Sequence, residues 1–118
     1  MLVAGVTLCA ASAIHFGLPI PLGFTTISDP IAGAAMPELI LGLIMLVGAT
    51  SMLRGHRLVA LACTGFTLLL TLYGASVTVR AAAWGDVAYH AALLTVLAAT
   101  LVLLLTRRKP QTTLRSSD

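Results

Sequence analysis

The stretch Arg80-Ala-Ala-Ala-Trp-Gly-Asp-Val-Ala-Tyr-His90 joins two long apolar runs and carries Arg80, Asp86 and His90 within one short window. The apolar runs on its two sides cover about residues 58–79 and 87–106. Each run is close to the roughly 20 apolar residues that a helix needs to cross a bilayer. Asp86 is a favoured N-cap residue for the second run. The stretch therefore predicts a tight turn between two membrane-spanning helices.

The composition of the whole chain supports a membrane protein. Of its 118 residues, 58% are hydrophobic and 9% are charged, whereas about 25% of the residues in an ordinary soluble domain are charged. A soluble fold of this size would be unable to bury so much apolar surface. The formal net charge is +3, but the basic residues stand at the ends of apolar runs and form no basic face. We therefore expect a lipid bilayer as the surrounding medium and no nucleic acid partner.

A further apolar run, residues 30–53, contains Pro37, which allows two interpretations. Proline removes a helical hydrogen bond and clashes with the residue four positions back. That residue is Gly33, which has the smallest side chain, so we favour one kinked helix over residues 30–53. The alternative is a loop followed by a helix that starts at Pro37. In the first case Glu38 lies about two turns inside the membrane, and in the second it lies in a first helical turn.

The first apolar run covers about residues 2–20, and residues 22–28 are expected to form a loop. Within this run Gly5, Cys9, Ala13 and Gly17 recur every four residues, and such a line of small side chains lets another helix approach closely. Short connections pack sequential helices antiparallel. The expected fold is an all-α, antiparallel up-down-up-down four-helix transmembrane bundle over residues 1–106. Its spans are about residues 2–20, 30–53, 58–79 and 87–106, and a polar cytoplasmic tail follows at 107–118.

The distribution of basic residues predicts the orientation of this bundle. With four spans, the second connection and the tail lie on the same side of the membrane, and basic residues concentrate on the cytoplasmic side. We therefore expect a multi-pass protein of the plasma membrane with both termini in the cytoplasm. The basic residues on that side are Arg54, Arg57, Arg107, Arg108, Lys109 and Arg115, and the opposite side has Arg80.

The same topology brings the chain's unusual polar residues to a similar depth near the outer face. A charged side chain at membrane depth costs about 2.5–3.5 kcal/mol or more, so it normally faces protein and has a partner. We expect these residues to form one ligand-binding site, in which Glu38 pairs with Arg80 or a histidine. The candidate residues are His15, Glu38, Tyr73, Arg80, Asp86 and His90.

Each of these residues also has a purely structural interpretation. His15 and His90 are amphipathic and can anchor helices at the lipid–water boundary. Arg80 can extend toward the headgroups and pair with Asp86 across the turn. Asp86 can serve only as a helix cap, and Tyr73 can serve only as packing. The sequence leaves both interpretations open.

The motifs favour no particular reaction. Two histidines on different helices can bind haem or a metal, but no His-x-x-His or Cys-x-x-Cys spacing supports such a site. Cys9 and Cys63 lie inside apolar runs, where free cysteine packs as a small hydrophobe. Asp86 and His90 share a helix face and are spaced for an acid–base pair. We therefore expect a quinone or a lipid as the bound group ahead of haem or a metal.

The length, the four expected spans and the small-residue-rich helices with a polar feature near one end resemble the small four-helix membrane proteins of the DoxX-like group. The resemblance covers the whole chain and concerns its layout. It implies a membrane-embedded component associated with quinone or thiol oxidoreductase systems. Small multidrug exporters have the same length and number of spans, but they place a glutamate in the middle of the first span, where this chain has no acid.

The first functional hypothesis is a small integral membrane protein that binds a quinone or lipid at a polar site in the outer half of the bundle, as an accessory component of a membrane redox system. A membrane enzyme is the alternative, in which His15, Glu38 and His90 serve proton transfer or bind a metal or haem. An oligomeric small transporter and a purely structural subunit complete the alternatives. A membrane protein partner or a second copy of the chain would suit any of these roles.

Overall fold

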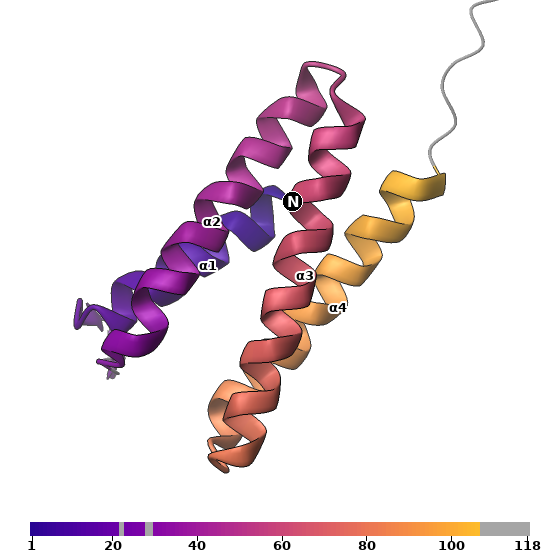
Figure 1. The fold of residues 1–118 in the computed structure, drawn as a ribbon. Coiled ribbons are helices and arrows are strands. Elements are labelled where there is room, and N and C mark those ends of the chain that lie inside the picture. Colours follow the sequence, from indigo (N-terminus) through magenta and orange to yellow (C-terminus); the bar gives the residue numbers. More distant parts are fainter. Residues whose placement is uncertain (22, 28–29, 107–118) are drawn as a thin grey trace, which may run out of the picture.

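The computed structural model describes residues 1–21, 23–27 and 30–106, and the predicted tail at 107–118 lies outside these residues. The described chain is an all-α protein whose four helices are joined by short connections (Figure 1). A small antiparallel hairpin, which pairs Ile20 with Ile27, connects the first two helices where a loop was expected. The elements are α1 (Leu2–His15), β1 (Ile20–Pro21), β2 (Thr26–Ile27), α2 (Ala32–Leu53), α3 (Arg57–Arg80) and α4 (Trp84–Thr106).

Among the described residues, α2, α3 and α4 are long and apolar enough to cross a membrane, with mean hydropathies of 1.8, 1.9 and 2.1. Many of their large apolar side chains point outward, including Leu69 and Leu103, which are 65% and 60% exposed. A helix that is hydrophobic all round and exposed in this way needs lipid as its surroundings. The chain is therefore a small helical membrane protein.

The first helix is shorter than the sequence predicted. α1 has 14 residues and ends at His15, so it is about 21 Å long and falls short of a bilayer core of about 30 Å. Gly17 follows in a left-handed conformation with φ +90°, which turns the chain before residue 20. The expected span over residues 2–20 is thus replaced by a short helix, a turn and one strand of the hairpin.

The other boundaries differ by a few residues, and two differences matter for the site. Pro37 lies inside α2, so the continuous helix was the better interpretation, and Glu38 lies within it. α4 begins at Trp84, three residues earlier than expected, which places Asp86 in the first helical turn and not at the N-cap. Ala82, with φ +53°, reverses the chain between α3 and α4. Asp29, which directly precedes the apolar run 30–53 and is a favoured N-cap residue type, lies outside the described residues.

The helices form two pairs, α1 beside α2 and α3 beside α4 (Figure 1). In the first pair the backbones approach closely, because a Cβ on Gly42 would lie 2.6 Å from Cys9 Sγ and 3.0 Å from the Gly5 carbonyl oxygen. The predicted contact line of small residues is therefore used at Gly5 and Cys9. In the second pair, Arg57 Nε and Nη2 donate to the carbonyl oxygens of Leu104 and Leu105 at 2.8 and 3.0 Å. These bonds satisfy carbonyls that a helix end leaves free.

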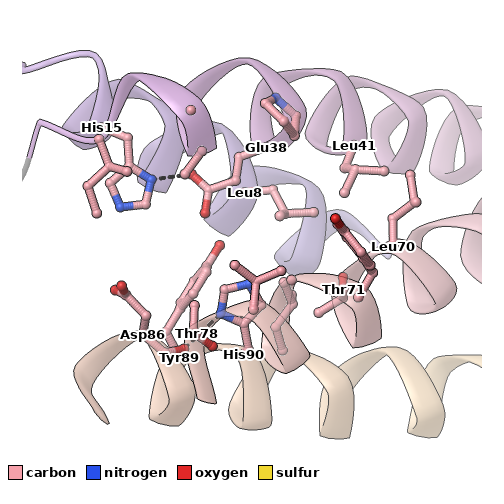
Figure 2. A pocket seen from close by; sticks show the side chains of 18 of the residues that line it. Leu8, His15, Glu38, Leu41, Leu70, Thr71, Thr78, Asp86, Tyr89 and His90 are labelled. Atoms are coloured by element: carbon pink, nitrogen blue, oxygen red, sulfur yellow. Dashed lines mark hydrogen bonds and ion pairs between the residues drawn. The ribbon is translucent and has the colours of Figure 1, made fainter. Parts of the chain in front are cut away.

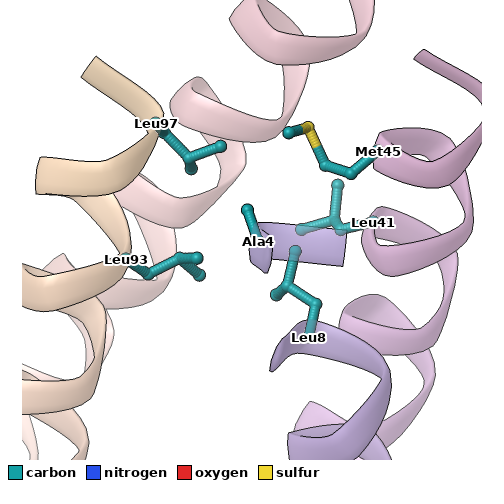
Figure 3. Close-up of a cluster of buried hydrophobic side chains, with 6 residues drawn as sticks. All are labelled: Ala4, Leu8, Leu41, Met45, Leu93 and Leu97. Atoms are coloured by element: carbon teal, nitrogen blue, oxygen red, sulfur yellow. The ribbon is translucent and has the colours of Figure 1, made fainter. Parts of the chain in front are cut away.

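A core of apolar side chains connects the two pairs near the middle of the helices (Figure 3). Leu8, Met45 and Leu97 are almost completely buried in it. Toward the end of the bundle that contains His15, the two pairs separate and leave a cavity. The core residues are Ala4, Leu8, Leu41, Met45, Leu93 and Leu97.

Candidate functional site

A cavity of about 880 Å³ lies between the α1–α2 pair and the α3–α4 pair, and residues from all four helices line it (Figure 2). Most of its wall is apolar and includes Leu8, Leu41, Leu70 and Leu93. Polar side chains gather at one end of the cavity, near the end of α1 and the beginning of α4. The described residues therefore form a large apolar chamber with a polar end, and it is open at the side, where the lining residues Phe66 and Leu70 are exposed.

On one wall of this chamber, His15 and Glu38 form a hydrogen-bonded pair. His15 Nδ1 lies 2.6 Å from Glu38 Oε2, and the two side chains are only 11% and 9% exposed. One turn before His15 in α1, Ser12 Oγ donates to the Ala35 carbonyl oxygen at 2.6 Å. Because the two bonds repeat along both helices, they fix the register of α1 against α2. The pair holds one exchangeable proton between an imidazole and a carboxylate at the edge of the cavity.

On the opposite wall, α4 contributes Asp86, Tyr89 and His90. His90 Nδ1 lies 2.7 Å from the Asp86 carbonyl oxygen. The His90 ring fits against α3 because residue 74 is glycine: a Cβ there would lie 2.6 Å from His90 Nε2. The rings of Tyr89 and His90 are arranged edge to face, with centroids 5.2 Å apart. Helix packing and a backbone hydrogen bond thus hold the imidazole of His90 in place.

Five of the six candidate residues line the cavity, namely His15, Glu38, Tyr73, Asp86 and His90. Figure 2 shows His15 and Glu38 on one side of it, with Asp86 and His90 on the other. Tyr73 lies at the margin, because its side chain is 69% exposed.

Arg80 is the candidate that the structure leaves apart from the others. It is exposed at the last residue of α3 and does not line the cavity. Among the described residues, Glu38 pairs with a histidine, and no ion pair joins Arg80 to Glu38 or to Asp86. The Arg80–Asp86 pair of the alternative, purely structural interpretation is therefore not found among the described residues.

Tyr89 is a site residue that the sequence interpretation missed. Its side chain extends from α4 toward the α1–α2 pair (Figure 2). Its hydroxyl is buried and has no hydrogen-bond partner among the described residues. The available signal was its position between Asp86 and His90, since a tyrosine inside an apolar run usually needs a partner for its hydroxyl.

The charges around the cavity are unevenly distributed. Glu38 and Asp86 line it, but within residues 1–21, 23–27 and 30–106 no lysine or arginine does so. The same residues bring no three His, Cys, Asp or Glu side chains together in a metal-ligating arrangement. The net charge of the polar end of the cavity therefore depends on the protons that its two carboxyl groups and two imidazoles hold.

Comparison with known proteins does not assign a function to the chain. No family model, curated protein or solved structure matches the chain. The shape of the cavity and the chemistry of its lining side chains are thus the basis for a functional assignment.

Proposed function

We propose that this small membrane protein binds an apolar small molecule with a polar head, of the quinone or neutral-lipid kind, in the cavity between its two helix pairs. The observation that supports it best is the cavity itself, about 880 Å³ with apolar walls and a polar end. Small-molecule sites in proteins are typically about 300–1,000 Å³, mostly apolar, with a few convergent polar groups that fix orientation.

The two parts of the cavity suit the two parts of such a ligand. Its polar end offers the His15–Glu38 pair and His90, which can hydrogen-bond a head group. Leu41, Leu70 and Leu93 provide apolar wall for a tail. Burial of a tail against them is favourable by about 25 cal/mol for each Å² removed from water. A ligand that arrives from the bilayer would gain less, so the head group would determine much of the specificity.

The charges favour a neutral head over a phosphate. Phosphates are usually held by arginine, lysine or a helix N-terminus free of acidic groups. No lysine or arginine of the described chain lines the cavity, and Asp86 adds a carboxyl group to the first turn of α4. A phospholipid head would therefore meet two acidic side chains and no fixed cation.

The proposal includes the protein's membrane, its orientation and its partners. Arg57 joins the beginning of α3 to the end of α4, so the basic turn at 54–57 lies at the same end of the bundle as Thr106, after which the sequence is basic. The positive-inside rule assigns that end to the cytoplasm and the cavity to the outer half of the plasma membrane. The first residue of the chain is on the same side of the cavity, since Met1 lies against Gly48 of α2, so the proposed orientation has both termini toward the cytoplasm although α1 is short. The DoxX-like layout suggests an accessory role in a membrane redox system, beside a partner protein or a second copy of the chain.

Fluorescence of Trp84, the only tryptophan in the chain, provides a direct test. Trp84 is adjacent to Ala83 and close to Asp86, both of which line the cavity. Quinones quench indole fluorescence at short range. A benzoquinone with a ten-carbon tail, added to the protein in lipid nanodiscs, should quench this fluorescence along a saturable curve. A linear response, equal to that of a free indole in empty nanodiscs, would overturn the proposal.

Two glycine variants control this measurement. Gly33 lines the cavity, and a Cβ added there meets no atom within 4 Å, so Gly33→Leu fills part of the cavity without a clash at Cβ. Gly65 has equal room but does not line the cavity. We expect Gly33→Leu to weaken binding of the quinone at least tenfold and Gly65→Leu to leave it unchanged. Equal binding by both variants would show that the quinone binds elsewhere.

A further inference from the structure

The hydrogen bond of His90 determines which of its ring nitrogens carries a proton. Nδ1 lies 2.7 Å from the Asp86 carbonyl oxygen, and a carbonyl oxygen can only accept a hydrogen bond. Nδ1 therefore carries the hydrogen and donates. In the neutral imidazole, Nε2 is then an acceptor without a hydrogen. This atom lies beside Gly74 at the wall of the cavity, where no side chain of residue 74 covers it.

The carboxyl groups add further acceptors to the same end. One oxygen of Glu38 bonds His15, and its second oxygen has no partner among the described residues. Asp86 also faces the cavity without a side-chain partner in that part of the chain. Whether His15 Nε2 donates or accepts depends on the position of the proton that Nδ1 and Glu38 share. The Tyr89 hydroxyl, which can donate, is buried without a partner. The other tyrosine of the cavity, Tyr73, lies at its exposed margin. With both carboxyl groups ionised, the acceptors around the polar end, which are His90 Nε2 and the free oxygens of Glu38 and Asp86, therefore outnumber the donors.

We propose that the ligand of this cavity carries its own hydrogen-bond donor, in the form of a phenol-type hydroxyl on an aromatic head, and that forms without this donor bind more weakly. The inference rests on the proposed function and names the ligand class for the same site. A hydroxyl donates to His90 Nε2 or to Glu38 and accepts at the same time. An ether or quinone oxygen only accepts, so it leaves these acceptors unpaired, which is unfavourable in an apolar cavity.

Two further observations favour a flat, neutral head. The edge-to-face rings of Tyr89 and His90 give this end an aromatic wall, and aromatic rings pack well against one another. The negative charge of Glu38 already has His15 beside it at 2.6 Å. Asp86 lies in the first turn of α4, where the helix dipole stabilises a carboxylate, so neither acid requires a cationic ligand. For a quinone-type molecule, the preferred state is the reduced, hydroquinone form.

A pair of matched compounds tests the inference without redox chemistry. The probes are 4-decylphenol and its methyl ether, which differ in the hydroxyl hydrogen. Binding is measured by calorimetry with the protein in lipid nanodiscs, and empty nanodiscs correct for partition into lipid. We expect the phenol to bind at least tenfold more tightly, which corresponds to about 1.4 kcal/mol.

The outcomes separate this inference from the proposed function. If the phenol and the ether bind with equal affinity, or the ether binds more tightly, the inference is wrong and the cavity remains a ligand site. If neither compound binds and the benzoquinone gives no saturable quenching, both proposals are wrong.

Variants identify the acceptor. His90→Phe keeps a ring of similar size and removes Nε2, so the preference for the phenol should fall below about threefold, since the lost hydrogen bond is most of the difference. His56→Phe, the same substitution in the exposed turn before α3, should keep the full preference. If His90→Phe does not fold, Glu38→Gln provides the test, because an amide replaces one acceptor oxygen with a donor. A preference that is unchanged in the folded variants would overturn the inference.

Discussion

The two helix pairs are held together in different ways. In the α1–α2 pair, polar side chains reach across the interface: Ser12 bonds the Ala35 carbonyl, and His15 bonds Glu38. In α3, two of the buried threonines bond their own helix, Thr64 to the Ala60 carbonyl and Thr71 to the Thr67 carbonyl, and the buried Thr67 hydroxyl has no partner among the described residues. The cavity end of the first pair is thus fixed by hydrogen bonds. In the second pair, the side-chain bonds between helices lie at the far end, from Arg57 to α4.

This difference explains why the cavity lies between the pairs and at one end. Within each pair, specific contacts fix the position of one helix against the other. Between the pairs, a hydrophobic cluster that includes Leu8 and Leu97 makes contacts without directional preference, and no side-chain hydrogen bond among the described residues joins one pair to the other. The polar groups of the site come from both sides of this apolar boundary. A ligand bound between the two helix pairs would therefore add polar contacts that join one pair to the other.

The largest expected effect comes from separating α1 from α2. In Gly42→Leu the new side chain would begin 2.6 Å from Cys9 Sγ and 3.0 Å from the Cys9 backbone nitrogen, and backbone atoms have little freedom to move. Overpacking typically costs about 1–3 kcal/mol and occasionally more, so we expect a loss of about 3 kcal/mol. The measurement is denaturant unfolding in mixed micelles, followed by the helical circular dichroism signal.

Gly65→Leu provides the matched control for this prediction. A Cβ at Gly65 meets no atom within 4 Å, and leucine is a better helix former than glycine by just under about 1 kcal/mol. The control should therefore be neutral or slightly more stable than the parent. Equal losses in the two variants would mean that α1 and α2 do not pack through Gly42.

A smaller effect is expected from the His15–Glu38 pair, measured by a double-mutant cycle. The single variants His15→Phe and Glu38→Gln and the double variant are unfolded under the same conditions. Residues in contact show coupling energies of about 0.5–3 kcal/mol, and we expect a value near 1–2 kcal/mol because both side chains are little exposed. Asp86→Asn with His15→Phe is the reference cycle and should give no coupling. Coupling below about 0.3 kcal/mol in the first cycle would contradict the pairing.

Much of the fold could be predicted from apolar length and local spacing. The apolar runs predicted α2, α3 and α4 to within a few residues, and Gly33 before Pro37 predicted one continuous helix. The four-residue spacing of Gly5 and Cys9 predicted their use as a helix contact. These features depend on neighbours in the sequence, which is why they are visible there.

Features that depend on turn geometry or distant partners were harder to predict. α1 ends at His15 because the backbone turns at Gly17, and an apolar run does not reveal such a turn. The early start of α4 placed Asp86 inside the helix, and Arg80, the last residue of α3, does not line the cavity. The position of Tyr89 depends on how α4 faces the other pair. The predicted spans placed His15 and Glu38 at similar depths in the membrane. The hydrogen bond between them depends on side-chain geometry, which only the structure shows.

The smallest expected effect distinguishes hydroxyls that bond across an interface from those that bond their own helix. Ser12→Ala removes a buried bond to the next helix at Ala35, and a typical hydrogen bond contributes about 1 kcal/mol. Thr64→Val removes a hydroxyl whose partner, the Ala60 carbonyl, lies in the same helix and keeps its ordinary helical position, so the loss should stay below about 0.5 kcal/mol. Both are measured by the same unfolding assay. A larger loss for Thr64→Val than for Ser12→Ala would show that the threonines of α3 hold the second pair together, and the contrast between the two pairs would no longer explain where the cavity lies.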